Sequence, residues 1–156
     1  MSVATRQTGE KNGSKRSILV DGRGIPLSLV VSGAQKHDVK LLPDTLDNIV
    51  VRRPKPRIRR RQHLCADKGY SGAPAKKQCI ERKYIPNVKQ RGEEIEEKRR
   101  NPRFKARRWV VERCLSWLNR FRKLLVRFEK YSHSYKGLLQ LACAIICFRQ
   151  TTFIYG

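Results

Sequence analysis

Short β-rich runs alternate with helical patterns along this chain, and that alternation limits the possible folds more than any other feature. Residues 17–21 and 25–32 predict two strands joined by the turn Gly22-Arg23-Gly24, which together form a hairpin. The patterns that follow are a helix from Asp38, a strand over 63–67, a helix over 73–83 and a short strand over 84–86. Strands that alternate with helices in this way predict an α/β domain with a mixed sheet.

The second half of the chain predicts two more helices. A long helical pattern lies between Lys98 and Glu129, and its apolar stripe has a period close to 3.6: Val111, Cys114, Leu115, Leu118, Phe121 and Leu125. The last helix, about Tyr135 to Arg149, is apolar on most sides, so we expect it to pack into the core. Its apolar stretch is shorter than the roughly 20 residues that a bilayer requires.

The length of 156 residues fits one domain. Residues 1–13 are polar and show no apolar period, so we expect a loose N-terminal segment there. We expect the folded body over 14–150 and a C-terminal tail over 151–156.

The charge balance favours a polyanionic partner. Lys and Arg number 36 against 13 Asp and Glu, which gives a net charge of +23. DNA is the partner that we favour, and an RNA-associated protein is another possible class. Seven cations lie between Arg52 and Arg61, where Pro54 and Pro56 predict an extended loop. We expect this loop to contact phosphates through Arg52, Arg53, Arg57, Arg59, Arg60 and Arg61.

Two carboxylates are candidates for chemistry. Between Lys98 and Lys130 there are thirteen Lys and Arg but only two acids, Glu112 and Glu129. An acid among cations weakens nucleic-acid binding unless it holds a divalent metal against a phosphate. Asp67 ends a predicted strand beside a glycine-containing turn, a common place for catalytic groups. The structural alternatives stay open: Asp67 as a turn residue, and Glu112 paired with Arg108.

Several motifs resemble one family in order along the chain. Ala66-Asp67-Lys68-Gly69-Tyr70-Ser71 resembles the strand end that carries the second catalytic Asp of bacterial insertion-sequence transposases with a DDE site. Residues 107–113 and 116–124 resemble the helix that carries their third acid. The segments 11–27 and 33–38 resemble the preceding part of the same domain, so the resemblance runs from about Gly9 to Gln150.

The resemblance implies an RNase H-like mixed sheet flanked by helices, and metal-dependent cleavage and strand transfer at transposon ends. Asp67 and Glu112 would be catalytic and would hold Mg²⁺ or Mn²⁺. Arg108 falls on the arginine of the family's tyrosine–arginine–glutamate–lysine signature, whereas Lys105 replaces its tyrosine and Asn119 its lysine. The other DNA contacts expected here are Lys68, Arg120 and Lys123.

The family's first acid lies on a strand upstream of the segment that matches Gly13 to Asp21, so we expect that first strand to be missing and the domain to be incomplete at its N-terminus. Asp21 is better explained as a turn residue and Asp38 as a helix cap. The chain is then either the downstream product of a two-frame gene, active with an upstream-frame product or as a homo-oligomer, or a catalytically inactive DNA-binding remnant.

The remaining reactive side chains have structural explanations. The five cysteines include Cys143 and Cys147, four residues apart, which could share a metal but are better explained as core thiols. Tyr70, Trp109 and Trp117 could stack on unpaired bases, although packing explains the two tryptophans better. With an odd number of cysteines and no signal peptide, we expect a cytoplasmic, nucleoid-associated bacterial protein that does not enter membranes.

Overall fold

A computed structural model describes residues 1–8, 13–66, 68–70, 72–88, 96, 99–100 and 108–155, without the side chains of 4–8, 68, 108 and 152–155. Its strands are β1 (Ser2–Thr8), β2 (Ser14–Val20), β3 (Pro26–Gly33), β4 (Gln62–Ala66) and β5 (Tyr84–Asn87). Its helices are α1 (Asp38–Asp47), the 3₁₀ turn η1 (Lys68–Tyr70), α2 (Ala73–Glu81), α4 (Arg108–Asn119), α5 (Arg122–Leu125) and α6 (Ser132–Tyr155).

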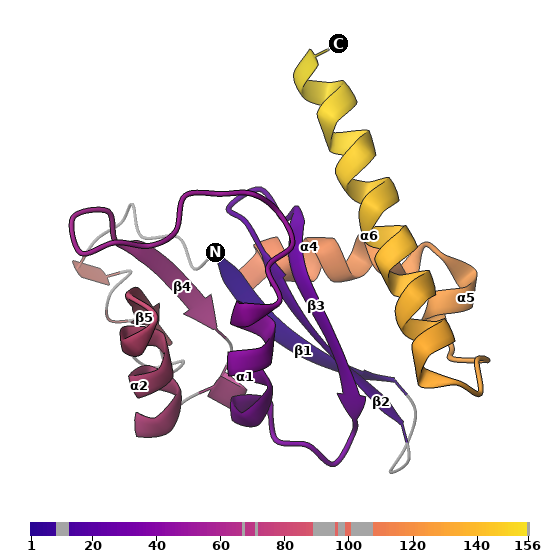
Figure 1. Ribbon diagram of the computed structural model, residues 1–156, viewed down its shortest axis with the longest axis horizontal. Helices are drawn as coiled ribbons and strands as arrows, with labels where there is room; N and C mark the ends of the chain where they lie inside the picture. Colours follow the sequence, from indigo (N-terminus) through magenta and orange to yellow (C-terminus); the bar gives the residue numbers. More distant parts are fainter. Residues whose placement is uncertain are drawn as a thin grey trace.

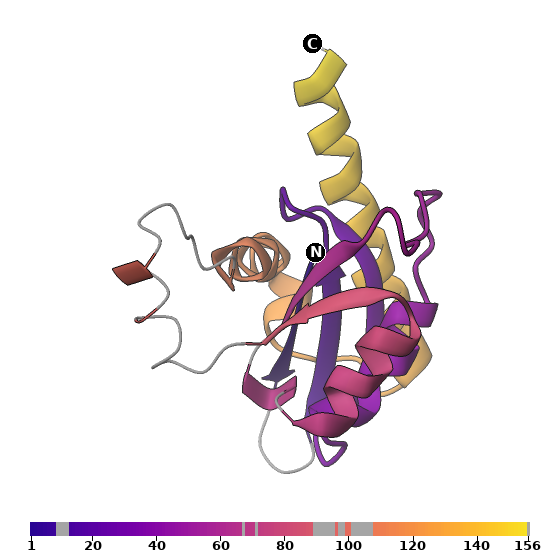
Figure 2. The ribbon, with the colours of Figure 1, turned by 90° about the vertical axis from the view of Figure 1, so that its left-hand side faces the viewer.

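The strands form one mixed sheet in the order β3-β2-β1-β4-β5. β1, β2 and β3 pair antiparallel, whereas β4 pairs parallel with β1 and with β5. Helices lie on both sides of the sheet: Figure 2 shows α4 on one side and α1 and α2 on the other. The predicted hairpin and the α/β class with a mixed sheet are therefore confirmed.

The N-terminal segment differs from the expectation. Residues 2–8 were expected to be loose and the first strand to be missing, but Ser2–Thr8 forms β1, the middle strand of the sheet. β1 bonds to β2 along its whole length and to β4 at its start. A polar strand can hold this position because both of its edges find backbone partners: the adjacent β2 on one side and, on the other, β4 about sixty residues further along, which no local pattern reveals.

The core consists of two clusters, one on each face of the sheet. Ile18 and Val20 face α4, α5 and α6, whereas Leu19 between them faces α1 and α2 with Leu64 and Tyr84. Alternate residues of a strand point to opposite faces, so a strand covered on both sides is apolar throughout. This explains the uninterrupted run Ile18-Leu19-Val20.

The C-terminal helices are arranged differently from the prediction. The expected single helix breaks after Asn119, and the short α5 follows, so Leu118 is buried but Leu125 is about half exposed. α6 runs to Tyr155, where a tail over 151–156 was expected, and it projects past the sheet (Figure 1). Within the described part of the chain, no helix is long and apolar enough to cross a membrane.

Candidate functional site

The carboxyl end of β4 lies beside the start of β1. Cys65 pairs with Ser2 and Ala66 with Val3, and the Cys65 amide donates a 2.8 Å hydrogen bond to the Met1 carbonyl. Ala66 packs toward α1 and α2, so strand alternation turns Cys65 toward the face that α4 covers. Asp67, the next residue of the chain, lies outside the described residues, and so does the side chain of Lys68.

The turn η1, which follows Asp67, is anchored to the rest of the domain. Tyr70 is fully buried, and its hydroxyl lies 3.2 Å from the Ser17 hydroxyl of β2. A Cβ at Gly69 would overlap the carboxylate of Asp38 at the start of α1. The expected stacking of Tyr70 on an unpaired base is wrong, since a fully buried ring cannot reach one.

Glu112 lies on the exposed side of α4. The opposite side of this helix packs on β2 through Val111, Cys114, Leu115 and Leu118, as its 3.6-residue period predicts. Glu112 itself is exposed, and it takes part in none of the three ion pairs found among the described side chains. The side chain of Arg108 lies outside the described residues, so the alternative pair between Arg108 and Glu112 stays a prediction.

The first turns of α4 rest on the β2–β3 turn. Gly24 has a φ of 87°, and a Cβ there would lie 3.1 Å from the Val110 carbonyl. The Arg113 guanidinium donates to the Arg23 carbonyl and lies 4.8 Å from the ring of Trp109 and 5.3 Å from that of Trp117. Arg113 was not among the predicted site residues. The tryptophans four positions before and after it could have indicated a cation that stacks between aromatic rings on one helix face.

The sheet register relates the two candidate segments. Ala66 pairs with Val3, Val3 pairs with Leu19, and the neighbours of Leu19 in β2 pack against α4. Neighbouring strands lie about 4.8 Å apart. The end of β4 and the first turn of α4, which rests on Gly24 just after β2 and contacts β1, are therefore held at the same end of the sheet.

The other acids near this end have structural roles. The Asp21 carboxylate accepts hydrogen bonds from the amides of Arg23 (2.8 Å) and Ile25 (2.9 Å), which confirms its turn role. The cap prediction for Asp38 is wrong by one residue, since His37 is the N-cap. Asp38 begins α1 and pairs with Lys15 at 2.9 Å. β1, with the sequence SVATRQT, contains no carboxylate.

The cysteines do not form a metal centre in the described part of the chain, where no group of three or more His, Cys, Asp or Glu is arranged to hold an ion. Burial raises the pKa of the Cys114 thiol and of the Cys143 thiol to about 12 each. Cys147 is half-buried, and burial raises its pKa too. These thiols stay protonated at neutral pH, whereas a metal binds the thiolate.

The predicted DNA-contacting residues fall into three groups. The loop cations Arg52, Arg57, Arg59, Arg60 and Arg61 are exposed, as are Arg120 and Lys123. Arg53 and Asn119 are only partly exposed, and Arg53 bonds to Gln62 and Met1. Lys105 and the side chains of Lys68 and Arg108 lie outside the described residues.

Comparisons with known proteins agree on one family. The family described as "Transposase DDE domain" matches residues 2–147. The protein "Putative transposase for insertion sequence element IS402" from Burkholderia cepacia is 34% identical over 138 residues, which cover 86% of this chain and 63% of that protein. The chain thus spans less than two thirds of this relative.

Solved structures show the fold. A chain of the simian T-cell lymphotropic virus intasome bound to the PP2A regulatory subunit B56 gamma matches with a TM-score of 0.58 and 12% identity, over 91% of this chain and 45% of that one. The catalytic core domain of BIV integrase matches with a TM-score of 0.46 and 11% identity, over 93% of this chain and 78% of that one. The expected RNase H-like fold is confirmed.

Proposed function

Because the chain belongs to the transposase DDE domain family, we propose that it is the catalytic-domain portion of an insertion-sequence transposase. Its reaction would be cleavage of DNA strands at transposon ends and their transfer to target DNA. Since the chain spans 63% of its relative, this activity would belong to a longer protein or to an assembly with an upstream-frame product or a second copy.

One observation carries the proposal. The strand that ends immediately before Asp67 and the helix that exposes Glu112 lie at one end of the sheet, joined through β1 and β2. Glu112 is exposed and outside the described ion pairs, although many cations surround it in the sequence. An exposed carboxylate that forms none of these ion pairs, in a cationic segment, suits a role as a metal ligand.

The donor set fits a hard cation. Asp67 and Glu112 would hold Mg²⁺ or Mn²⁺, because such ions prefer carboxylate oxygens together with water and phosphate oxygens. A bound ion would stabilise the charge that develops on the attacking and leaving oxygens of a phosphodiester.

The cationic side chains would bind and orient the DNA. Arg108 would hold Glu112 or a phosphate, and the exposed loop cations would neutralise phosphates without reading the base sequence. Arg120 and Lys123 are exposed near the end of α4, so they could take over the contact of the signature lysine that Asn119 replaces.

Metal-directed cleavage of the protein backbone tests this proposal. Fe²⁺ in place of Mg²⁺, with ascorbate and peroxide, produces radicals that cut the chain close to the bound ion. We expect cuts near residue 67 and near residue 112. Asp67→Asn should remove both sets of cuts, and so should Glu112→Gln, because the two carboxylates would share one ion.

The matched control is Glu81→Gln, which changes an exposed glutamate at the end of α2 and should leave both sets of cuts in place. If Glu112→Gln removes only the cuts near residue 112, the two acids do not share an ion and the proposed site is wrong.

A second candidate function is DNA binding without catalysis, and the acid-free β1 favours it. It predicts that the chain retards DNA in a gel while Fe²⁺ produces no cuts near residues 67 and 112. The same preparation of protein therefore separates the two functions.

A further inference from the structure

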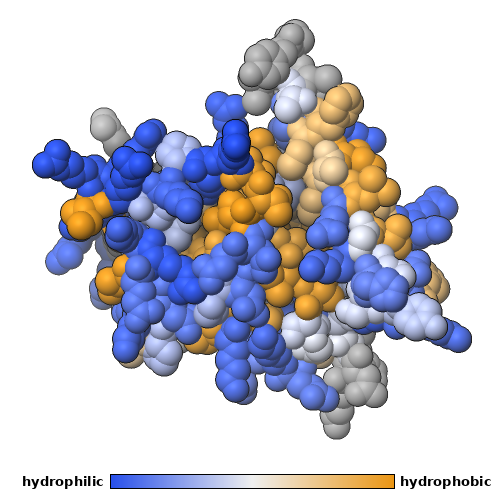
Figure 3. All heavy atoms as spheres, viewed as in Figure 1, coloured by the Kyte–Doolittle hydropathy of each residue, from blue (hydrophilic) through white to orange (hydrophobic). Residues whose placement is uncertain are grey.

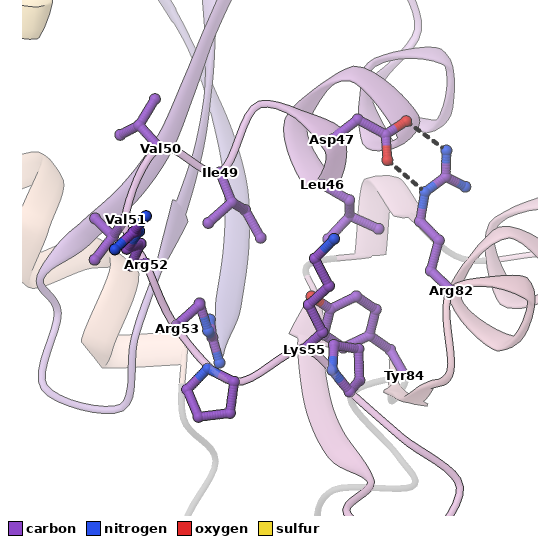
Figure 4. A pocket seen from close by; sticks show the side chains of 12 residues that line it. Leu46, Asp47, Ile49, Val50, Val51, Arg52, Arg53, Lys55, Arg82 and Tyr84 are labelled. Carbon is purple, nitrogen blue, oxygen red and sulfur yellow. Dashed lines mark hydrogen bonds and ion pairs between the residues drawn. The ribbon is translucent and has the colours of Figure 1, made fainter.

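A pocket of about 870 Å³ lies between α1, the start of β5 and the loop 49–56 (Figure 4). It is on the α1 and α2 face of the sheet, opposite the face that α4 covers. Small-molecule sites have volumes of about 300–1,000 Å³, so the pocket is large enough for a nucleotide. Neither Asp67 nor Glu112 lines it.

The loop that forms one wall is held in place by the sheet. The Val50 amide donates to the Leu27 carbonyl of β3 at 3.3 Å, and the Gln62 side chain of β4 donates to the Pro54 carbonyl at 2.8 Å. The guanidinium of Arg53 bonds to Gln62 and Met1. Proline also restricts the backbone at Pro54. The pocket is therefore largely formed before any ligand binds.

The charges around the pocket favour an anion. Arg52, Arg53, Lys55 and Arg82 line it, together with a single acid, Asp47. Asp47 is bound by Arg82 through two hydrogen bonds of 2.9 and 2.7 Å, and this lowers its pKa, so it remains a paired carboxylate. Arg52 and Lys55 are exposed and belong to none of the ion pairs among the described residues.

The inner wall offers apolar surface and one hydroxyl. Leu46 and Ile49 contribute aliphatic side chains, whereas the side chain of Val50, 85% exposed, points away from them at the rim (Figure 4). Burial raises the pKa of Tyr84, so its hydroxyl keeps its proton at neutral pH. A ligand with both a flat apolar part and an anionic part would match this combination.

We propose that the pocket binds one nucleotide of single-stranded DNA, with its base against Ile49 and its phosphate near Arg52 and Lys55. This inference rests on the proposed function and names a second contact with the same substrate. A paired base is stacked inside the duplex and cannot enter a recess, so the pocket selects unpaired nucleotides such as those beside a cleaved end.

Removing the apolar contact without changing the charge tests the proposal. Ile49→Ala shortens a side chain that lines the pocket, and Ile58→Ala removes the same atoms from the same loop outside the pocket. Ile49 is only partly buried and Ile58 is 72% exposed, so neither change should unfold the domain. The probes are a labelled oligothymidylate and a labelled blunt duplex, compared by fluorescence anisotropy at one salt concentration.

We expect Ile49→Ala to weaken oligothymidylate binding about tenfold, from the loss of one base contact, with duplex binding unchanged. Ile58→Ala should change neither. If the two variants bind oligothymidylate with equal affinity and duplex binding is intact, the pocket does not bind a nucleotide. The proposed function would be unaffected by that result. If the parent protein binds neither probe, both proposals fail.

A second pair of variants tests the phosphate contact. Lys55→Glu and Arg59→Glu change the charge of the loop equally, but only Lys55 lines the pocket. Lys55→Glu should lower the affinity for oligothymidylate more than Arg59→Glu does. Competition by a polyglutamate peptide that Ile49→Ala abolishes, without any effect of Ile49→Ala on oligothymidylate, would assign the pocket to an acidic protein partner instead.

Discussion

Gly24 is the residue that seats α4 on the sheet. Its φ of 87° belongs to the left-handed region, and the Val110 carbonyl lies where its Cβ would come into close contact. The local motif Gly22-Arg23-Gly24 predicted a turn, but it did not reveal that a helix more than eighty residues further along the chain rests on it. The position of Glu112 therefore depends on this glycine.

Gly24→Ala should lower the free energy of unfolding by about 1–2 kcal/mol, because an L-residue is strained at this φ. Urea denaturation measures the change. Gly22→Ala is the matched control, since Gly22 has no atom within 4 Å of its Cβ position and no positive φ, and it should stay within about 0.5 kcal/mol of the parent. Equal losses in the two variants would contradict this role of Gly24.

The arginines differ in whether they make structural contacts within the domain, which their number in the sequence does not predict. Arg16 is fully buried, and its guanidinium donates to the Leu124 carbonyl at 3.4 Å, so it holds α5 against the sheet. Arg127 donates to the carbonyls of Glu129 and Lys130, and it lies 5.3 Å from the ring of Tyr135. Only the three-dimensional packing separates such structural arginines from those available to DNA.

At the scale of elements, α6 has one buried face and one exposed face. Tyr135, Leu139, Ala142 and Ile146 pack against the core, whereas Leu141 and Phe148 remain exposed. Figure 3 shows hydrophobic residues along this helix. The predicted packing of this helix into the core is confirmed for the side that faces the domain, while apolar residues on its other side stay exposed.

Two leucines of α6 provide a direct test of this arrangement. Leu139→Ala should lower the free energy of unfolding by about 2–5 kcal/mol, because it leaves a cavity in the core. Leu141→Ala removes the same atoms from a side chain that is 59% exposed and should change stability by no more than about 0.5 kcal/mol. Similar losses in thermal or urea unfolding would show that the exposed face of α6 is covered in solution.

At the scale of the whole molecule, the basic surfaces lie far apart. The loop 52–61 is at one end of the domain and α5 at the other (Figure 1). Exposed cations at both ends would let one domain contact separate stretches of DNA, which suits the proposed joining of two DNA segments.

Replacing Arg57, Arg59 and Arg60 with alanine should reduce the salt dependence of duplex binding. The slope of log K against log salt should become shallower by about 0.9 for each phosphate contact that is lost. The control replaces Lys40, Lys76 and Lys77, exposed cations of α1 and α2, and removes the same charge. An equal change of slope in both triple variants would mean that net charge alone, and not the loop, determines binding.

The local patterns of the sequence determined most of the elements. The hairpin, α1, β4, α2, β5 and the buried stripe of α4 follow from apolar period, turns and breakers, which act over a few residues. The motifs around Asp67 and Glu112 also sufficed to recognise the family.

Tertiary structure alone decided the place of β1, the break between α4 and α5, the exposed face of α6 and the pocket behind the basic loop. These features depend on partners elsewhere in the fold: β1 is central because β4, about sixty residues later, pairs with the edge that β2 leaves free, and the pocket exists because β3 and β4 hold the loop away from α1. Local spacing carries no information on such pairings, since their free energy arises only when the whole sheet has formed.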